Sequence, residues 1–359
     1  MARFEVTDGV PADWDTYAGD GPAAARGRWI AFGQSWYPGP YHTFALRDAD
    51  GSCQVALGGT VLPEPAGVPR RDPWHLLTGR TGSLGLFPDG GHPWSADLDP
   101  AVVHPCQVLM YPNYVTFPVG RGAADPAALR AFVAGLVDWA SVQDVASVAL
   151  LYLTPRADPL LAALAEAGFG TARMGERCDL PVTWTDFAGY LRSLPKKHRD
   201  EVKREINRLG ERGLVRAARP LREHEPELLD LRCQLIAKYD GGVDPAAQAT
   251  MLDLIRRHVA PEDITVFTVS AGDRLLSFSL FIQDGREWTV MLTGSAYGDP
   301  DAAYGYFSTM FYQPAEQAPA RGVELVAYGY GTLDAKRRRG CRLSPYYAAE
   351  LRLRAGPVG

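Results

Sequence analysis

The spacing of apolar residues changes along the first half of the chain. Two apolar runs flank Asp50 and Gly51, and this pair predicts a β-hairpin because glycine adopts positive φ without steric cost. Between 126 and 141 the apolar residues recur every three or four positions, which predicts an amphipathic helix with Asp125 as N-cap. The other patterns predict strands at 41–46, 53–62, 107–119, 145–153 and 169–182 and a helix at 158–166. This order predicts a mixed α/β sheet.

The second half repeats this plan. Its patterns predict helices at 195–212, 223–238 and 245–259, strands at 264–270, 275–282 and 288–293, a long helix at 301–321 and a strand at 323–327. Two halves of similar order indicate an internal duplication. We therefore expect two domains, 1–182 and 183–359.

Composition is consistent with a two-domain globular protein. The chain has 359 residues, of which 46% are apolar and 22% charged. Its apolar runs stop short of the roughly 20 residues that a membrane span needs, and the first residues do not resemble an export signal, so we expect a soluble, cytoplasmic protein with no membrane span. The histidines and cysteines lack metal-ligand spacing, and we predict no metal.

Positive charge is concentrated in two places, although the formal net charge is -5. Eleven Lys or Arg face four Asp or Glu between Arg192 and Arg222, and residues 336–339 are an unbroken basic run. Such local concentration on an acidic protein predicts one defined anionic ligand.

Four stretches, in order along the chain, match the motifs of a known family. Residues 187–205 follow F-x-x-[FY]-L-x-x-L-x-x-[KR]-x-R-x-x-[IV]-[KR]-[KR]-E, and residues 110–121 are similar to Y-P-K-L…P-F-T-P…G-x-R. Residues 311–322 are similar to Y-Y-x-P-I-E-x-A-I-x-x-G, and residues 334–340 to E-x-K-x-x-R-G. With these motifs the chain resembles the GNAT-superfamily peptidoglycan biosynthesis/recognition family, which is FemABX-like.

This resemblance implies a tandem fold of two N-acetyltransferase-like domains. It also implies kinship with enzymes that transfer an aminoacyl group from aminoacyl-tRNA to an amine. The chain departs from the family pattern where Asp334 and Ala335 replace Glu-His and where Leu333 replaces a usual glycine. A histidine-based mechanism in this loop is therefore not expected.

The acyl donor can be aminoacyl-tRNA or acyl-CoA. The predicted helix at 195–212 carries cations off its apolar stripe, at a spacing that suits nucleic-acid phosphates, although an ordinary solvated helix has the same pattern. The residues expected to contact tRNA are Lys196, Lys197, Lys203, Arg204, Arg208 and Arg212. Acyl-CoA enzymes of this superfamily hold the pyrophosphate with [QR]-x-x-G-x-[GA], for which Gly120, Arg121 and Gly122 are a degenerate alternative. No further cofactor is expected.

The candidate active site lies in the last third of the chain. We expect Lys336 and Arg339 to bind the tRNA end or an anion of the acceptor, with Tyr328, Gly329, Tyr330 and Gly331 as a strand-end loop. Tyr304 is a further substrate-binding candidate, and the catalytic candidates are Asp334, Glu316 and Tyr312. The alternative interpretations are a solvated turn at 336–339, an ion pair of Glu316 with Arg321, and Tyr312 as a core residue.

These expectations lead to three candidate functions. The first is an aminoacyl-tRNA-dependent transferase that forms an amide or peptide bond on an amine of a small natural-product or cell-wall precursor. The second is an acyl-CoA-dependent N-acyltransferase. The third is a non-catalytic module that binds a precursor or RNA.

Overall fold

The computed structural model describes residues 2–18, 22–37, 39–80, 86–87, 91–240 and 242–353. The chain divides into two compact units. Unit 1 comprises 1–177 and 344–359, and unit 2 comprises 178–343. Strands β6 (Gly170–Pro181) and β12 (Arg342–Arg352) therefore contribute residues to both. Among the described residues, no helix combines the length and apolar character required to cross a membrane.

Unit 1 is a mixed sheet covered by helices. Its strand order is β1-β2-β3-β4-β5-β12-β6, and only β4 and β5 pair in parallel among the registers assigned to described residues. Its further strands are β1 (Arg3–Asp8), β2 (Tyr41–Arg47), β3 (Cys53–Leu62), β4 (Cys106–Leu109) and β5 (Ser147–Leu153). Its helices are α1 (Trp14–Ala18), α2 (Gly27–Trp36), α3 (Pro73–Leu77), α4 (Pro126–Val142) and α5 (Asp158–Glu166), with short 3-10 turns at η1 (Ala23–Ala25), η2 (Pro69–Arg71), η3 (Pro100–Val102) and η4 (Pro155–Ala157).

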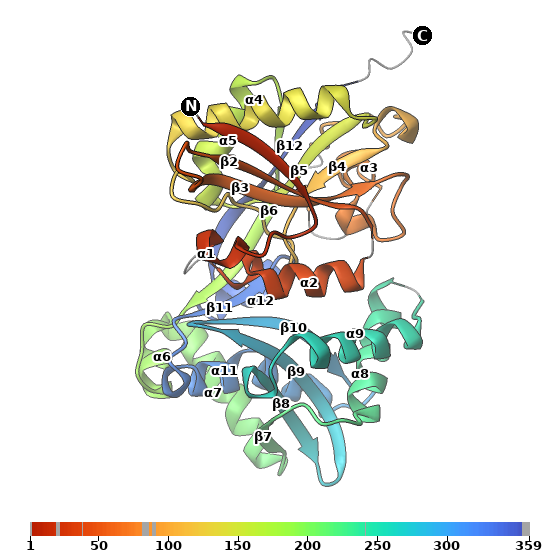
Figure 1. Cartoon of the computed structure of the whole chain (residues 1–359). Helices are drawn as coiled ribbons and strands as arrows, with labels where there is room; N and C mark the ends of the chain where they lie inside the picture. Colours follow the sequence, from red (N-terminus) through yellow and green to blue (C-terminus); the bar gives the residue numbers. More distant parts are fainter. Residues whose placement is uncertain are drawn as a thin grey trace. The chain divides into compact units, whose positions relative to one another are not determined.

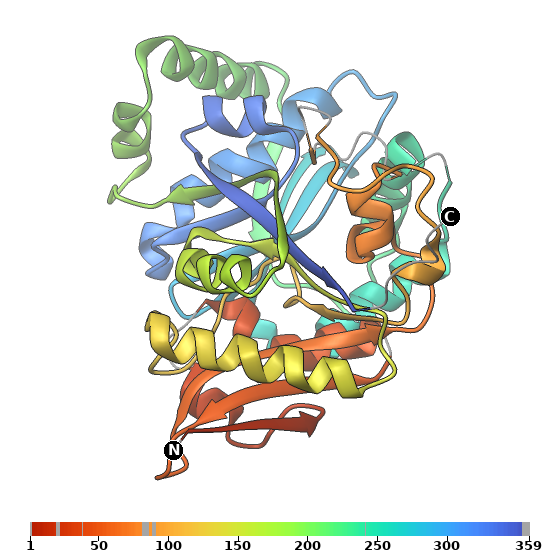
Figure 2. The same cartoon turned by 90° about the horizontal axis from the view of Figure 1, so that it is seen from above.

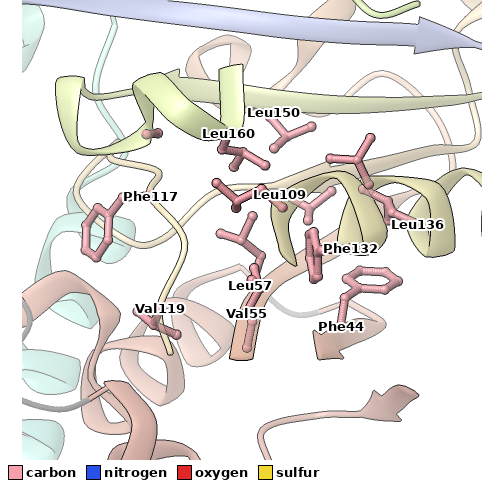
Figure 3. Packing of buried hydrophobic residues seen from close by; sticks show 14 of the residues in the cluster. Phe44, Val55, Leu57, Leu109, Phe117, Val119, Phe132, Leu136, Leu150 and Leu160 are labelled. Atoms are coloured by element: carbon pink, nitrogen blue, oxygen red, sulfur yellow. The ribbon is translucent and has the colours of Figure 1, made fainter. Parts of the chain in front are cut away.

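Helix α4 runs across strands β2 and β3, as Figure 2 shows. It begins where predicted, because the Asp125 side chain accepts a hydrogen bond from the Ala127 N–H. Its apolar face supplies Phe132 and Leu136, which lie with Leu57 and Leu150 of the sheet in the core of unit 1 (Figure 3). Burial of this apolar face fixes the helix on the sheet.

Unit 2 repeats a mixed sheet with strand order β6-β11-β10-β9-β8-β7 (Figure 1). Strands β10 and β11 are parallel, and the other pairs are antiparallel. The strands that lie wholly in this unit are β7 (Val215–Arg219), β8 (Ile264–Ala271), β9 (Arg274–Asp284), β10 (Glu287–Ser295) and β11 (Leu325–Gly329). Its longer helices are α6 (Phe187–Ser193), α7 (Lys196–Glu211), α8 (Pro226–Asp240) and α9 (Pro245–His258), and a 3-10 turn, η5 (Pro261–Asp263), precedes β8.

Helices cover both faces of the unit 2 sheet. Adjacent residues of a strand point to opposite faces, so Ser277 and Phe278 of β9 mark the two sides. Helix α8 packs on the Phe278 side so closely that a Cβ at Gly294 would lie 2.6 Å from the backbone carbon of Leu231. On the other side, Gly305 of α10 (Ala302–Phe307) lies against Ser277.

The prediction of one continuous α-helix at 301–321 is wrong. The structure has α10, a π-helical turn η6 (Ser308–Tyr312), α11 (Gln313–Gln317) and a 3-10 turn η7 (Pro319–Arg321). Proline at 314 and 319 removes backbone donors and accounts for the breaks, and Gly322 ends the segment at φ 66°. The basic run forms a short helix, α12 (Leu333–Arg338).

The sequence patterns also missed several elements. The strand predicted at 107–119 is β4 alone, which ends at Leu109 and is followed by isolated bridges. Strands β1, β7 and β12 and helices α1, α2 and α3 were not predicted. Strand β7 has an exposed burial pattern, and such edge strands carry little apolar alternation.

Candidate active site

A charged hydrogen-bond network is buried in unit 2. Its centre is Arg339, which follows α12 and is 3% exposed. Its Nη2 donates to Glu205 Oε1 at 3.0 Å and to Oε2 at 3.1 Å, and its Nε donates to the Tyr312 hydroxyl at 3.1 Å. The Tyr312 hydroxyl donates to Glu205 Oε2. Arg339, Glu205 and Tyr312 thus form a closed ring of hydrogen bonds.

Further contacts hold Arg339 in place. Its Nη1 donates to the Ala335 carbonyl at 3.0 Å, and its Cζ lies 3.5 Å from the centroid of the Phe307 ring. The buried Tyr190 hydroxyl donates to the Arg339 carbonyl at 3.0 Å. A buried guanidinium is costly unless its charge and donors are matched, and this arrangement matches both.

Glu205 and Tyr312, the two partners of Arg339, are positioned by α7 and by η6. Val202 and Leu209 are the buried residues of α7, and Glu205 lies three residues after Val202 on the same face. Tyr312 is the last residue of the π-helical turn η6, and its side chain is fully buried. π-helical turns are rare in proteins, but those that occur often lie at functional sites.

Electrostatics maintain the charge pattern of the network. Burial alone would lower the pKa of Arg339, but Tyr312 and Glu205 outweigh it and raise the pKa above its ordinary value. Burial raises the pKa of Tyr312, and the neighbouring Glu205 raises it further while Arg339 opposes the rise. Arg339 therefore stays cationic and Tyr312 stays a neutral hydrogen-bond donor across the physiological range.

In the basic run 336–339, Lys336 and Arg339 are buried, and the two residues between them are exposed. Lys336 is 4% exposed, and its Nζ donates to the carbonyls of Tyr328 and Tyr330 at 2.8 Å and of Gly329 at 3.3 Å. These bonds fix the loop after β11. Lys336 thus holds the loop that we expected to bind substrate.

Asp334 lies on the exposed side of α12. It accepts hydrogen bonds from Arg337 at 2.7 Å and Arg338 at 3.1 Å. Arg338 and Arg337 lower the pKa of its carboxyl, which weakens Asp334 as a proton acceptor.

The other site candidates are spread over unit 2. Glu316 is exposed and pairs with Arg216, its Oε2 lying 3.2 Å from Nη1. Tyr304 is half-buried beneath Arg208 of α7 and the C-cap residue Arg212, whose Cζ atoms lie 5.9 Å and 5.0 Å from its ring centroid. These contacts associate Tyr304 with the basic helix.

The loop after β11 combines a buried aromatic residue with glycines. Tyr328 is 4% exposed and packs on Phe311 at 4.7 Å between centroids, and burial raises its pKa. Its hydroxyl has no hydrogen-bond partner in the described part of the chain. Gly329 and Gly331 have φ of 62° and 79°, a region that favours glycine. Tyr330 is half-buried, and the structure brings it to Lys336 through its carbonyl.

The outward face of α7 is cationic. All six residues predicted to contact tRNA are exposed: Lys196, Lys197, Lys203, Arg204, Arg208 and Arg212. The first three make no ion pair with any residue that the structure describes. The same helix thus carries Glu205 inward and cations outward.

The N–H groups of the alternative phosphate loop in unit 1 already donate hydrogen bonds to protein carbonyls. The N–H groups of Gly120, Arg121 and Gly122 donate to the carbonyls of Tyr17, Cys53 and Gln54, respectively, at 3.1, 3.3 and 2.7 Å. Arg121 itself pairs with Asp48 at 2.6 Å. A phosphate would have to displace these bonds.

N–H groups of the corresponding loop of unit 2, after β10, also donate hydrogen bonds within the protein. Ala296 N donates to the Leu276 carbonyl at 2.9 Å, and Asp299 N donates to the Ala296 carbonyl at 3.0 Å. The Asp301 N–H and Arg274 bind the Asp299 carboxylate and lower its pKa. Two carboxylates at this position disfavour a pyrophosphate.

Sequence reasoning missed Glu205 and Tyr190. Glu205 was part of a charged helix, and only its place as the final letter of the 187–205 motif marked it. The structure joins that letter to the arginine of the R-G pair in the 334–340 motif, and Tyr312 belongs to the 311–322 motif. Three of the four motifs therefore meet in one network. The described residues contain no group of three or more His, Cys, Asp or Glu able to hold a metal ion.

Comparisons with known proteins bear on the fold of the chain. Residues 196–337 match the family model described as acetyltransferase (GNAT) domain. The structure of FemX is 11% identical with a TM-score of 0.61, over 96% of this chain and 96% of that chain. L-PGS from Bacillus licheniformis is 10% identical with a TM-score of 0.53, over 98% of this chain and 95% of that chain.

A tandem GNAT protein from the clavulanic acid biosynthesis pathway is 11% identical with a TM-score of 0.50, over 99% of this chain and 100% of that chain. None of the curated proteins matches the chain. At these identities the solved structures show a shared fold, which confirms the predicted mixed α/β, tandem architecture. Residues 196–337 therefore match the acetyltransferase (GNAT) domain family, and the chain as a whole has a tandem GNAT-like fold.

Proposed function

We propose that the protein transfers an aminoacyl group from aminoacyl-tRNA to the amine of a small natural-product or cell-wall precursor. One observation carries this proposal. Helix α7 joins the buried Glu205–Arg339–Tyr312 network to a face with five exposed cations and a sixth, Arg212, at its C-cap. A rigid helix with this distribution can bind a polyanion on one face and support chemistry on the other.

The transfer converts an ester into an amide. The amine nitrogen attacks the ester carbonyl carbon, the bond from that carbon to the tRNA hydroxyl oxygen breaks, and the proton lost by the amine ends on that oxygen. The donor ester is already activated, so the protein needs to position the reactants, accept a proton and stabilise the oxyanion.

The network offers groups for these tasks. The Glu205 side chain is 18% exposed and is the least buried of the three, so we assign it to accept the proton of the amine. Arg339 and Tyr312 act as positioning residues, because both hold the Glu205 carboxylate. Asp334 and Glu316 are exposed and lie outside the network, whereas Tyr312 is buried and bonded to Glu205, which favours Tyr312 among the candidates taken from the sequence.

The hydrogen bonding of the loops that would hold a CoA pyrophosphate favours aminoacyl-tRNA over acyl-CoA as the donor. In both units, N–H groups of these loops donate to protein carbonyls. An aminoacyl-tRNA needs no such loop, since exposed Lys and Arg side chains bind its backbone phosphates.

An assay with the purified protein separates the donors. It receives either radiolabelled aminoacyl-tRNA or labelled acetyl-CoA, a panel of amines, and RNase in a parallel sample. We expect label in an amide product from aminoacyl-tRNA and its loss after RNase. RNase-insensitive transfer from acetyl-CoA would overturn the proposal, and saturable tRNA or amine binding without turnover would place the chain among recognition modules.

A further inference from the structure

A cluster of buried hydroxyl groups lies between the unit 2 sheet and the π-helical turn η6. It includes two cross-strand pairs, since Ser277 and Ser279 of β9 stand opposite Ser295 and Thr293 of β10. Residues two apart on a strand point to the same face, so Ser279 lies with Ser277 on the α10 side. Both β9 serines are fully buried, and each Oγ lies 3.2 Å from the hydroxyl oxygen of its partner on β10. This part of the sheet therefore presents hydroxyl groups, although buried positions are more often apolar.

Thr309 of η6 joins these hydroxyl groups to the turn. Its side chain is fully buried, and its Oγ1 lies 3.2 Å from Ser277 Oγ and accepts a hydrogen bond from Ser279 Oγ at 3.1 Å. The Thr309 hydroxyl donates in turn to the Tyr306 carbonyl at 3.2 Å. A threonine that bonds a carbonyl of the preceding turn often bends the helix that contains it. Thr309 thus links the irregular turn to strand β9.

The neighbours of Thr309 cannot take its place without loss. Met310 offers only a weak thioether acceptor, which lies 3.7 Å from Ser279 Oγ. The Ser308 hydroxyl is itself fully buried and lies 3.5 Å from Gln313 Nε2. Since buried hydroxyl groups that lose hydrogen bonds cost free energy, the cluster favours the observed register of η6 against the sheet.

Gln313 anchors the chain on the other side of Tyr312. It is 2% exposed, and its Nε2 donates to the carbonyl of Thr268 on β8 at 3.1 Å. Tyr312 therefore lies between two buried anchors, three residues after Thr309 and directly before Gln313. Both anchors bond strands of the sheet, so the backbone that carries the Tyr312 ring has little freedom to turn away from Glu205.

We propose that Thr309 is a positioning residue, which the two β9 serines hold in place so that the Tyr312 hydroxyl meets the Glu205 carboxylate. The inference rests on the proposed function in one respect, because Glu205 is the group to which we assign the proton of the amine. The step from Thr309 to the hydrogen bond between Tyr312 and Glu205 does not require transfer activity. It can therefore be tested separately.

A double-mutant cycle measures the coupling between Thr309 and Tyr312. Thr309→Val keeps the shape of the side chain and removes its hydroxyl, and Tyr312→Phe removes the hydroxyl that bonds Glu205. Urea denaturation gives the stability loss from Tyr312→Phe in the wild-type and in the Thr309→Val background. We expect the loss to be about half as large or less in the Thr309→Val background, because residues of one network are not additive. Thr309→Ser retains the hydroxyl and should restore the full loss.

The matched control is Thr265→Val in the same unit. Thr265 is 3% exposed, and its hydroxyl accepts a hydrogen bond from Arg321 Nη2 at 3.3 Å. This variant also removes a buried, bonded hydroxyl, but its effect and that of Tyr312→Phe should be additive. If Thr309→Val does not fold, Ser279→Ala takes its place in the cycle, since it removes a donor to Thr309.

The transfer assay supplies a second measurement. We expect Thr309→Val to lower kcat about tenfold and to leave KM for aminoacyl-tRNA unchanged, because the exposed cations of α7 are not altered. Additive effects of Thr309→Val and Tyr312→Phe, or equal coupling from Thr265→Val, would overturn the inference, as would an unchanged kcat in an active protein. Coupling in a protein that does not transfer an aminoacyl group would instead support the positioning role and refute the proposed function.

Discussion

Arg339 and Lys336 show how burial decides what a basic residue does. They belong to one run of basic letters, yet both are buried and fully engaged, whereas Arg337 and Arg338 are exposed and pair with Asp334. The basic run was visible in the sequence, but which of its residues are buried and which are exposed was not. The partner of Arg339 is Glu205, 134 positions away, and no local pattern indicates which acidic residue of a charged helix points inward.

The burial of Arg339 predicts a large cost for losing its partner. Glu205→Gln leaves a buried guanidinium without its counter-charge, and we expect it to reduce the free energy of unfolding by about 3 kcal/mol. Glu316→Gln is the matched control, because the exposed pair of Glu316 with Arg216 contributes about 1 kcal/mol or less. Urea denaturation of both variants checks this, and equal losses would contradict the role of burial.

Tyr312 predicts a specific alkaline response. Its pKa is raised in the folded protein, chiefly by burial, whereas an unfolded tyrosine ionises near pH 10. Below pH 10 the contribution is fully present. Above it the unfolded chain releases a proton that the folded protein keeps, so stability falls by up to about 1.4 kcal/mol per pH unit for this residue. Denaturation of wild type and Tyr312→Phe between pH 9 and 11, a range set by that reference value of about 10, should show a shallower decline in the variant.

Among the elements, α7 was the easiest to predict, and it carries both Glu205 and the exposed cations. Its pattern predicted 195–212, and the helix runs from Lys196 to Glu211, because a regular apolar stripe is a local property. The segment 301–321 was harder, since prolines and a π-helical turn interrupt an otherwise helical stretch. That irregularity places Tyr312, so the local pattern was least informative where the site is built.

The outward face of α7 predicts a salt-dependent effect. Replacing Lys196, Lys197 and Lys203 together with glutamine should weaken tRNA binding and reduce the slope of log affinity against log salt by roughly 0.7 to 0.9 for each phosphate that the helix no longer neutralises. Stability should change little, because these side chains make no ion pair within the described chain. Filter binding across a salt series measures the slope.

The control for this helix lies in unit 1. Arg130, Arg156 and Arg173 are exposed as well, and their joint replacement with glutamine removes the same charge. An equal change in slope from both triple variants would show that net charge, and not the α7 face, determines binding.

At the scale of the whole molecule, two similar halves were predictable, but the limits of each half could not be derived from local pattern. Unit 1 takes its strand β12 from the end of the chain, where β12 pairs antiparallel with the fully buried β5. A sequence gives no local sign that its last strand belongs beside its fifth. Long-range pairing of this kind depends on the complete chain.

This topology predicts which fragments fold. A fragment of residues 1–182 lacks β12 and exposes the edge of β5, so we expect it to aggregate or to show no cooperative unfolding. Residues 1–177 joined to 344–359 by a short Gly-Ser linker should fold cooperatively in thermal denaturation. A cooperative 1–182 fragment would instead support the domain division expected from the sequence.

The late position of β12 also has a consequence for biosynthesis. Unit 2 is one continuous stretch and can form as it leaves the ribosome, whereas unit 1 must wait until residues 344–352 of β12 have been made. The part made first is thus the part completed last. During that interval β5 lacks its partner β12, and its apolar residues are accessible to chaperones.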